Sequence, residues 1–289
     1  MRHRVNLLDM WIDKIDVTGT VAQIDSFARN GRAQGRSYQI VTVNVDFLRL
    51  GSQNAAFRDL INTSDLAVPD GKPLLWGARM LKDPLPERVT GIELIGECAA
   101  LAVRKGYSIF LLGAREGVAA QAAAVLKEQH PGLRIAGIYS PPVGPFSKED
   151  EDQMVRMVQE VQPDMLFVAF GAPRQDLWIR KHMQRLNVPL CMGVGGSLDM
   201  IAGRVKRAPL WMREGGLEWL YRFSQEPTRL WKRYFVDDLP VFGRLMAQWI
   251  TGSPSARSVT ALLEGYPTFD GPPAVESVEV KEDEGVHVA

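Results

Sequence analysis

Between residues 106 and 201, short apolar runs alternate with longer segments whose apolar residues recur at helical spacing. The runs predict strands and the longer segments predict helices, in turn at 108–112, 118–129, 133–139, 149–161, 165–170, 175–186 and 189–194. Apolar strands that alternate with helices build a parallel sheet covered by helices on both faces. We therefore expect a Rossmann-like, doubly wound α/β fold that binds its ligand at the carboxyl ends of the strands.

The first hundred residues also mix strand and helix patterns. Strands are predicted at 37–47 and 66–68, and helices are predicted to begin at 57–60 and to run over 73–81. Because no linker precedes residue 252, we expect this half to pack against the second half in one α/β core, residues 1–210. A helical appendage, residues 211–251, follows. Residues 252–289 lack any helical or strand period and carry many acidic side chains, which predicts a disordered tail.

Charge and cysteine content exclude several classes of protein. The 34 basic residues balance the 34 acidic ones, so the overall charge gives no indication of nucleic-acid binding. Cys98 and Cys191 each lie in an apolar run, which is typical of the reducing cytoplasm and not of a disulfide-bonded domain.

The chain begins with basic residues, as export signals do, but Asp9, Asp13 and Asp16 interrupt any hydrophobic region. No apolar run reaches the roughly 18–20 residues that a membrane-spanning helix needs, and the best late stretch, 239–250, contains Arg244. We therefore expect a cytoplasmic protein that touches a membrane without crossing it.

Glycines follow three of the predicted strands, at the edge of the sheet where a ligand would bind. They are Gly113, Gly171, Gly193, Gly195 and Gly196. Glycine lets the backbone approach a phosphate, whose charge the next helix N-terminus favours, although tight turns without a ligand also use glycine. Asp199 at the start of the next helix either belongs to this site or only complements the helix dipole.

Three polar residues at strand ends are candidates for catalysis. Asp70, in Pro69-Asp70-Gly71, is either a general base presented at the end of a strand or a turn-forming aspartate. Thr42 and Asn44 alternate with apolar neighbours in a predicted buried strand. Buried polar groups need hydrogen-bond partners, which either a substrate or a neighbouring loop would supply.

Arg88, Arg174 and Gln175 are candidates for binding an anion. Arg88 lies in the segment 86–91, and the other two residues come just after a predicted strand. Each of these side chains is either a clamp for a charged substrate or an ordinary surface group.

The acidic stretch 149–152 does not predict a metal site. Ser147 stands three residues before Asp150, and this spacing together with the acidic residues predicts a capped helix N-terminus. The 4 histidines are scattered, so no zinc site is expected. Neither a Gly-x-Ser-x-Gly elbow nor a Walker lysine loop occurs.

Aromatic and basic residues alternate over 211–234, and Pro227 divides the stretch into two predicted helices. Such a surface suits the headgroup layer of an anionic membrane. An aromatic cap packed on the core, with its arginines bonded to carboxylates, is the alternative.

These segments together resemble the WecG/TagA/CpsF family of bacterial glycosyltransferases, from about residue 6 to residue 235. The resemblance rests on Thr42-Val43-Asn44-Val45-Asp46, Pro69-Asp70-Gly71, Pro86 to Gly91, Phe170 to Gln175, Gly193 to Asp199 and Ala202 to Pro209. Glu93, Asp176 and Val43 depart from residues common in the family, but each substitution keeps the charge or the apolar character.

The resemblance implies transfer of a sugar from a UDP-sugar to a polyprenyl-diphosphate-linked saccharide during assembly of a surface polysaccharide. It implies an inverting reaction without a metal or other cofactor, with Asp70 as the base. Thr42, Asn44, Arg88 and Gln175 would be the other catalytic residues of the substrate pocket. The appendage would dock on the membrane and supply arginines, with Arg222, Arg229 and Arg233 or Lys232 as candidates.

Two other functions remain open from the sequence. A nicotinamide dehydrogenase would share the doubly wound sheet, but the turn after Gly113 lacks the three-glycine spacing. A non-catalytic sensor of nucleotide sugars would keep the pocket and would not need Asp70. Self-association into a homo-oligomer is also possible for a member of this family.

Overall fold

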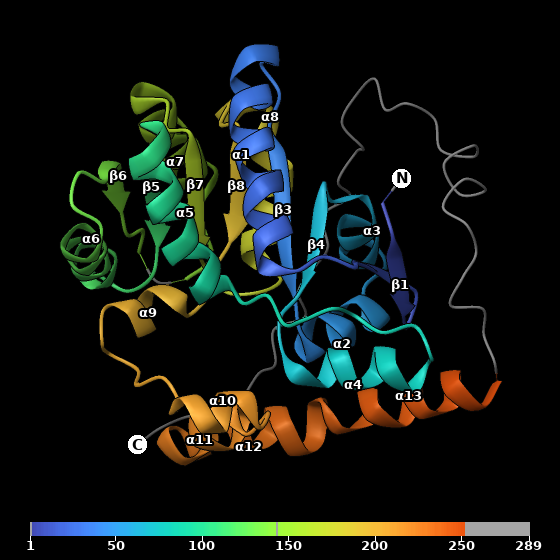
Figure 1. Cartoon of the computed structure of the whole chain (residues 1–289). Helices are drawn as coiled ribbons and strands as arrows, with labels where there is room; N and C mark the ends of the chain where they lie inside the picture. The colour runs from blue at the N-terminus through green and yellow to red at the C-terminus, as the bar shows by residue number, and fades with distance from the viewer. Residues whose placement is uncertain (1, 143, 252–289) are drawn as a thin grey trace. The chain divides into compact units, whose positions relative to one another are not determined.

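A six-stranded parallel sheet forms the centre of the fold, with strand order β4-β3-β8-β7-β5-β6 (Figure 1). This computed structural model describes residues 2–142 and 144–251, so the predicted tail lies outside the described residues. The strands are β3 (Tyr38–Val43), β4 (Leu66–Pro69), β5 (Ser108–Gly113), β6 (Arg134–Tyr139), β7 (Met165–Ala169) and β8 (Leu190–Gly193). The predicted doubly wound α/β fold is confirmed. The two halves of the core share this sheet, because β3 and β4 come from the N-terminal half.

Helices cover both faces of the sheet, as the apolar strands require. One face packs against α1 (Val17–Gln34), α5 (Gly91–Lys105), α6 (Val118–Gln129) and α9 (Ser197–Ile201). The other face packs against α2 (Val45–Gln53), α3 (Ala55–Thr63), α4 (Lys72–Met80), α7 (Lys148–Val161) and α8 (Arg174–Leu186). The Ser147–Asp150 capping box begins α7, as the sequence predicts.

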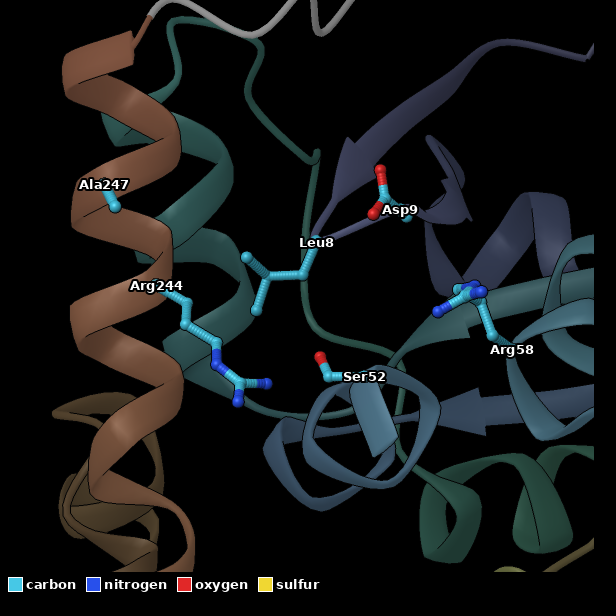
Figure 2. A pocket seen from close by; sticks show the side chains of 6 residues that line it. All are labelled: Leu8, Asp9, Ser52, Arg58, Arg244 and Ala247. Atoms are coloured by element: carbon cyan, nitrogen blue, oxygen red, sulfur yellow. The ribbon is translucent and has the colours of Figure 1, made fainter. Parts of the chain in front are cut away.

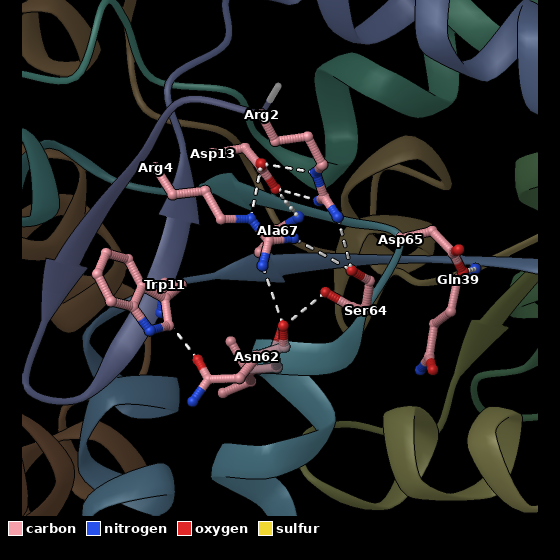
Figure 3. A network of polar contacts seen from close by, with 10 residues as sticks. Arg2, Arg4, Trp11, Asp13, Gln39, Asn62, Ser64, Asp65 and Ala67 are labelled. Atoms are coloured by element: carbon pink, nitrogen blue, oxygen red, sulfur yellow. Dashed lines mark hydrogen bonds and ion pairs between the residues drawn. The ribbon is translucent and has the colours of Figure 1, made fainter. Parts of the chain in front are cut away.

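An N-terminal hairpin, not predicted from the sequence, is bonded to β4. It consists of β1 (Arg4–Leu7) and β2 (Met10–Asp13). The buried carboxylate of Asp13 accepts hydrogen bonds from Arg2 and Arg4, and from the backbone N–H of Ala67 in β4 at 2.8 Å (Figure 3). Arg4 also donates to the carbonyl of Ser64 just before β4. The hairpin therefore holds the strand that ends at Asp70.

The predicted strand 37–47 is too long. β3 ends at Val43, and the Asn44 side chain accepts a hydrogen bond from the N–H of Phe47 at 3.2 Å, which caps α2. The apolar residues after Asn44 suit a buried helix as well as a strand. The helix cap decides between the two, because asparagine favours the N-cap position.

Residues 210–251 are mostly helical, as expected. They form α10 (Leu210–Glu214), α11 (Glu218–Gln225), α12 (Pro227–Trp231), a π-helical turn η1 (Lys232–Asp237) and α13 (Leu239–Thr251). Pro227 separates α11 from α12, as predicted. α13 lies beside α2 and α4 (Figure 1) and buries Val241 and Leu245 in the core cluster that includes β1 and β2. Within the described residues, no helix is long and apolar enough to cross a bilayer.

Candidate active site

Asp70 lies at the carboxyl end of the sheet, directly after β4. Its backbone N–H donates to the carbonyl of Val43 at 2.7 Å, and the N–H of Val89 donates to the carbonyl of Pro69 at 2.8 Å. These bonds fix the turn between the end of β3 and the segment that carries Arg88. The strand-end turn predicted from the sequence is therefore held by hydrogen bonds to its neighbours.

The surroundings of Asp70 favour its protonated form at low pH and its action as a base near neutrality. Burial raises the pKa of this carboxyl to about 7, and the negative charges of Glu218 and Glu93 also raise it. The guanidinium groups of Arg88 and Arg222 lower it. A base is most effective when its pKa lies near the working pH, so Asp70 has the properties of a general base.

Four charged side chains next to Asp70 form a closed set of ion pairs, which we call the charge ring: Arg88, Glu93, Arg207 and Glu218. Arg88 donates to Glu218 at 2.8 Å and to Glu93 at 3.0 Å. Arg207 donates to Glu93 at 2.6 Å, and its Nε lies 3.8 Å from Glu218. The ring connects the core to α11, because Glu218 is the first residue of that helix.

Sequence reasoning found Arg88 but missed Glu218 and Arg207. Glu218 is separated from Arg88 by 130 positions, and nothing in its local sequence marks it as a partner. Arg207 lies in one of the segments that resemble the family, but that segment alone did not indicate a role for this side chain.

Thr42 lies where two helices meet the end of the sheet. It is buried, and its Oγ1 is 3.5 Å from the carbonyl oxygen of Gly193. A Cβ added at Gly91, the first residue of α5, would lie 3.3 Å from Ser197 Oγ and 3.9 Å from Thr42. The N-terminus of α5 is thus directed at this group of residues, with Thr90 as its cap.

Gln175 joins two of the glycine turns. Its side-chain oxygen accepts hydrogen bonds from the N–H of Gly171 at 3.1 Å and the N–H of Gly195 at 2.9 Å. Gln175 thus ties the turn after β7 to the turn after β8. Gly195 has φ of 50°, a backbone conformation that glycine adopts without strain.

The other predicted site residues take several positions. Asn44 caps α2, as described above. Gly113 has φ of 105°, and a Cβ there would lie 2.7 Å from the carbonyl oxygen of Ala169, so close packing of β5 on β7 requires glycine. Gly196 is exposed, and Asp199 is half-buried in the first turn of α9, a helix of only 5 residues. The dipole of such a short helix is small.

Two groups of arginines differ in their placement. The Arg174 guanidinium lies 3.5 Å from the ring centroid of Phe146 and 5.7 Å from that of Phe170, so it stacks on aromatic rings. Arg222, one turn after Glu218 on α11, is close enough to affect Asp70. The side chains of Arg229 and Arg233 lie outside the described part of the structure.

A cavity of about 320 Å³ opens beside the charge ring. Three basic side chains (Lys72, Arg88 and Arg213) and three acidic ones (Glu87, Glu93 and Glu214) line its wall. A second cavity, of about 330 Å³, lies between the hairpin turn, α2, α3 and α13 (Figure 2) and has a different set of lining residues: Leu8, Asp9, Ser52, Arg58, Arg244 and Ala247. The first cavity is therefore the one that belongs to the site around Asp70. Within the described residues, no group of three or more His, Cys, Asp and Glu could hold a metal ion.

A carboxylate with a raised pKa beside several arginines, at the carboxyl end of a doubly wound sheet, suits an enzyme that transfers a group to or from an anionic substrate. Comparison with known proteins specifies the class further. Residues 5–255 match the model of the glycosyl transferase WecG/TagA/CpsF family, so the chain belongs to this family and is a glycosyltransferase. The resemblance inferred from the sequence is confirmed, and the dehydrogenase and the non-catalytic sensor are excluded.

Relatives of known name are found in Staphylococcus aureus. Proteins from strains MW2, MRSA252 and NCTC 8325 / PS 47 are each 32% identical to this chain over 240 residues, which is 83% of this chain and 90% of theirs. Each is named N-acetylglucosaminyldiphosphoundecaprenol N-acetyl-beta-D-mannosaminyltransferase.

Proposed function

We propose that this enzyme transfers N-acetylmannosamine from its UDP derivative to a saccharide linked to polyprenyl diphosphate. The names of the relatives support both the sugar and the lipid-linked acceptor. The observation that carries the proposal is the position of Asp70 near Arg88 and Arg222, whose positive charges act on its carboxyl, so that a base and cations occur in one site. Both substrates contain a diphosphate, and arginine forks bind phosphate well.

The reaction is a single displacement that inverts the anomeric carbon. Asp70 accepts the proton of the acceptor hydroxyl. At the same time the oxygen of this hydroxyl attacks the anomeric carbon from the face opposite UDP. The bond from the anomeric carbon to the UDP oxygen breaks, and UDP departs with the electron pair. A well-placed base contributes about 10²–10⁴-fold to the rate.

The departing UDP gains negative charge, which needs stabilisation. Arg88 and Arg222 provide positive charge next to Asp70, and the N-terminus of α5 adds the dipole of a helix of 15 residues. We propose that these groups replace the metal ion on which other sugar transferases depend.

A lipid-linked acceptor requires the enzyme to reach the membrane surface. The appendage exposes large apolar side chains, among them Trp211, Trp231, Trp249 and Ile250, on α10, α12 and α13. Tryptophan and basic side chains together suit the headgroup layer. We propose peripheral binding to the cytoplasmic membrane through this surface.

The first experiment is to measure UDP release by the purified full-length protein with several UDP-sugars and a short-chain prenyl-diphosphate-linked N-acetylglucosamine, with EDTA present. Release that requires both UDP-N-acetylmannosamine and the acceptor supports the proposal. Release with a different sugar corrects the donor. Release only after a divalent ion replaces EDTA contradicts metal independence, and no release with any donor contradicts the proposed reaction.

A further inference from the structure

We propose that Arg88 and Arg207 together form a binding site for a diphosphate group, and that Glu218 of α11 fills this site until the substrate arrives. Arg207 would then bind the diphosphate, and Glu218 would control access to its binding site. The site is argued from the geometry alone, and only the identity of the molecule that carries the diphosphate rests on the proposed function.

The geometry of Glu218 resembles that of a bound phosphate. One carboxylate oxygen, Oε2, lies 2.8 Å from Arg88, and the other, Oε1, lies 3.8 Å from Arg207. A single anionic group thus lies between two guanidinium groups and presents an oxygen to each. Phosphate binds arginine with the same arrangement of oxygens.

Arg207 is not fully satisfied by this arrangement. Its Nε is buried and has no hydrogen-bond partner among the described residues, because Glu218 is too far away for a hydrogen bond. A buried donor without a partner is costly. A phosphate oxygen that approaches this donor more closely would satisfy it, since a diphosphate extends further than a carboxylate.

The two acidic members of the charge ring differ in how firmly they are held. Glu93 belongs to α5, a long core helix, and contacts both arginines at hydrogen-bonding distance. Glu218 belongs to α11, a helix of 8 residues with no buried side chain and no side-chain cap. Displacement of Glu218 therefore disturbs little packing, whereas Glu93 stays and keeps the arginines in place.

Exchange of Glu218 for a diphosphate leaves the surroundings of Asp70 negative. In this structure Glu218 contributes a negative charge near Asp70. A diphosphate at the same place supplies that charge when Glu218 leaves. The adjoining cavity of about 320 Å³, which also reaches Arg88 and Glu93, gives the group room to enter.

Calorimetric titration of the full-length protein with inorganic pyrophosphate tests the site directly. We expect Glu218→Gln to bind pyrophosphate about 3- to 10-fold more tightly, because the competing carboxylate is gone, and Arg207→Gln to bind it about tenfold more weakly. Glu97→Gln and Arg104→Gln are matched controls, since both residues are exposed on α5, outside the charge ring. Both controls should bind as the wild type does.

Unchanged or weaker binding by a folded Glu218→Gln variant would overturn the inference. Should that variant fail to fold, Arg207→Lys decides, because it keeps the charge but loses the fork. Its affinity should fall between those of the wild type and Arg207→Gln, and wild-type affinity would contradict a role for Arg207.

Titrations with UDP and with a short-chain prenyl diphosphate then identify which molecule supplies the diphosphate. The natural ligand is the one whose affinities rank the variants in the same order as pyrophosphate does. These titrations need no sugar transfer. Tighter pyrophosphate binding without transferase activity would therefore support the site and refute the proposed function, and the reverse result would refute the site alone.

Discussion

Asp70 combines two features at the scale of a single residue: a turn that holds it rigidly and a pKa raised to about 7. A general base must be ionised, so we expect kcat/KM to rise with pH and to level off above about pH 7. A pH–rate profile of UDP release checks this. A rate that stays level from pH 5.5 to 8.5 would contradict a role for Asp70 as the base.

Substitution of the same residue provides a second prediction. Asp70→Asn removes the proton acceptor and keeps the shape, so turnover should fall by about 10²–10⁴-fold while UDP affinity stays within a few-fold. Asp59→Asn is the control, because Asp59 is exposed on α3. Normal turnover by Asp70→Asn would refute the proposed mechanism.

Asp176 shows what a buried carboxyl does to stability. It is fully buried, and burial raises its pKa from 3.8 to about 7, although the neighbouring Gln175 side chain lowers it. Because the folded-state pKa lies above the unfolded value, the associated stability is present below about pH 4 and is lost as pH rises through about 7. At about 1.4 kcal/mol per pKa unit, the loss is on the order of 4 kcal/mol.

We therefore expect Asp176→Asn to reduce the pH dependence of stability. Urea unfolding at pH 5 and pH 8 should show a smaller loss of unfolding free energy in the variant, by a few kcal/mol. Asp70 has a similar shift and is present in both proteins, so its contribution cancels in the comparison. An equal loss in both proteins would mean that Asp176 titrates normally.

At the scale of elements, the contact between β8 and α8 depends on Gly193. A Cβ at this position would lie 2.5 Å from Gln175 Nε2 and 2.6 Å from Asp176 Oδ1. Gly193→Ala should cost about 1–3 kcal/mol of stability and should weaken UDP binding, because Gln175 holds the turns at Gly171 and Gly195. Unfolding and UDP titration measure both effects.

Gly96→Ala is the matched control for this change. Gly96 lies in the middle of α5, and a Cβ there meets no atom within 4 Å. Alanine should stabilise this helix by about 0.5–1 kcal/mol and leave UDP binding unchanged. Equal effects of the two substitutions would contradict the packing argument at Gly193.

The sequence could predict elements whose periodicity is strong. The helix at 118–129 and the carboxyl-end turns after β5, β7 and β8 were found from apolar spacing and glycine. The end of β3 was wrong, because an asparagine cap overrode an apolar run. The hairpin was missed because its strands are only 4 residues long and its anchors, such as the Asp13 bond to Ala67, join distant parts of the chain.

The candidate site shows the same division. Asp70, Arg88 and Arg222 stand in segments with a recognisable pattern, and the structure brings them together. The roles of Glu218 and Arg207 could be recognised only from the folded structure, in which both contact the core. Pairing across 130 positions leaves no trace in local spacing.

At the scale of the whole molecule, the appendage exposes large apolar side chains, and its Lys232 and Arg244 are exposed as well. Ile250 is 71% exposed and Trp249 is 48% exposed, both near the end of α13. We expect the protein to sediment with vesicles containing phosphatidylglycerol and to bind less as salt increases. The double variant Trp249→Ala/Ile250→Ala should bind vesicles about tenfold more weakly.

Val161→Ala is the control for vesicle binding, because Val161 is an exposed apolar residue at the end of α7 in the core. The double variant should retain activity with a water-soluble acceptor. Unchanged vesicle binding by the double variant would exclude this end of α13 as the docking surface.

The bond from Ala67 to Asp13 has a further consequence for the behaviour of the protein in solution. β4 is the edge strand of the sheet, and the N–H of Ala67 faces outward, where an unpaired strand would otherwise recruit another chain. A carboxylate on that N–H accepts the hydrogen bond and places a charge at the edge. The hairpin thus protects β4 against edge-to-edge aggregation, and we expect an N-terminal truncation to expose this strand edge next to Asp70.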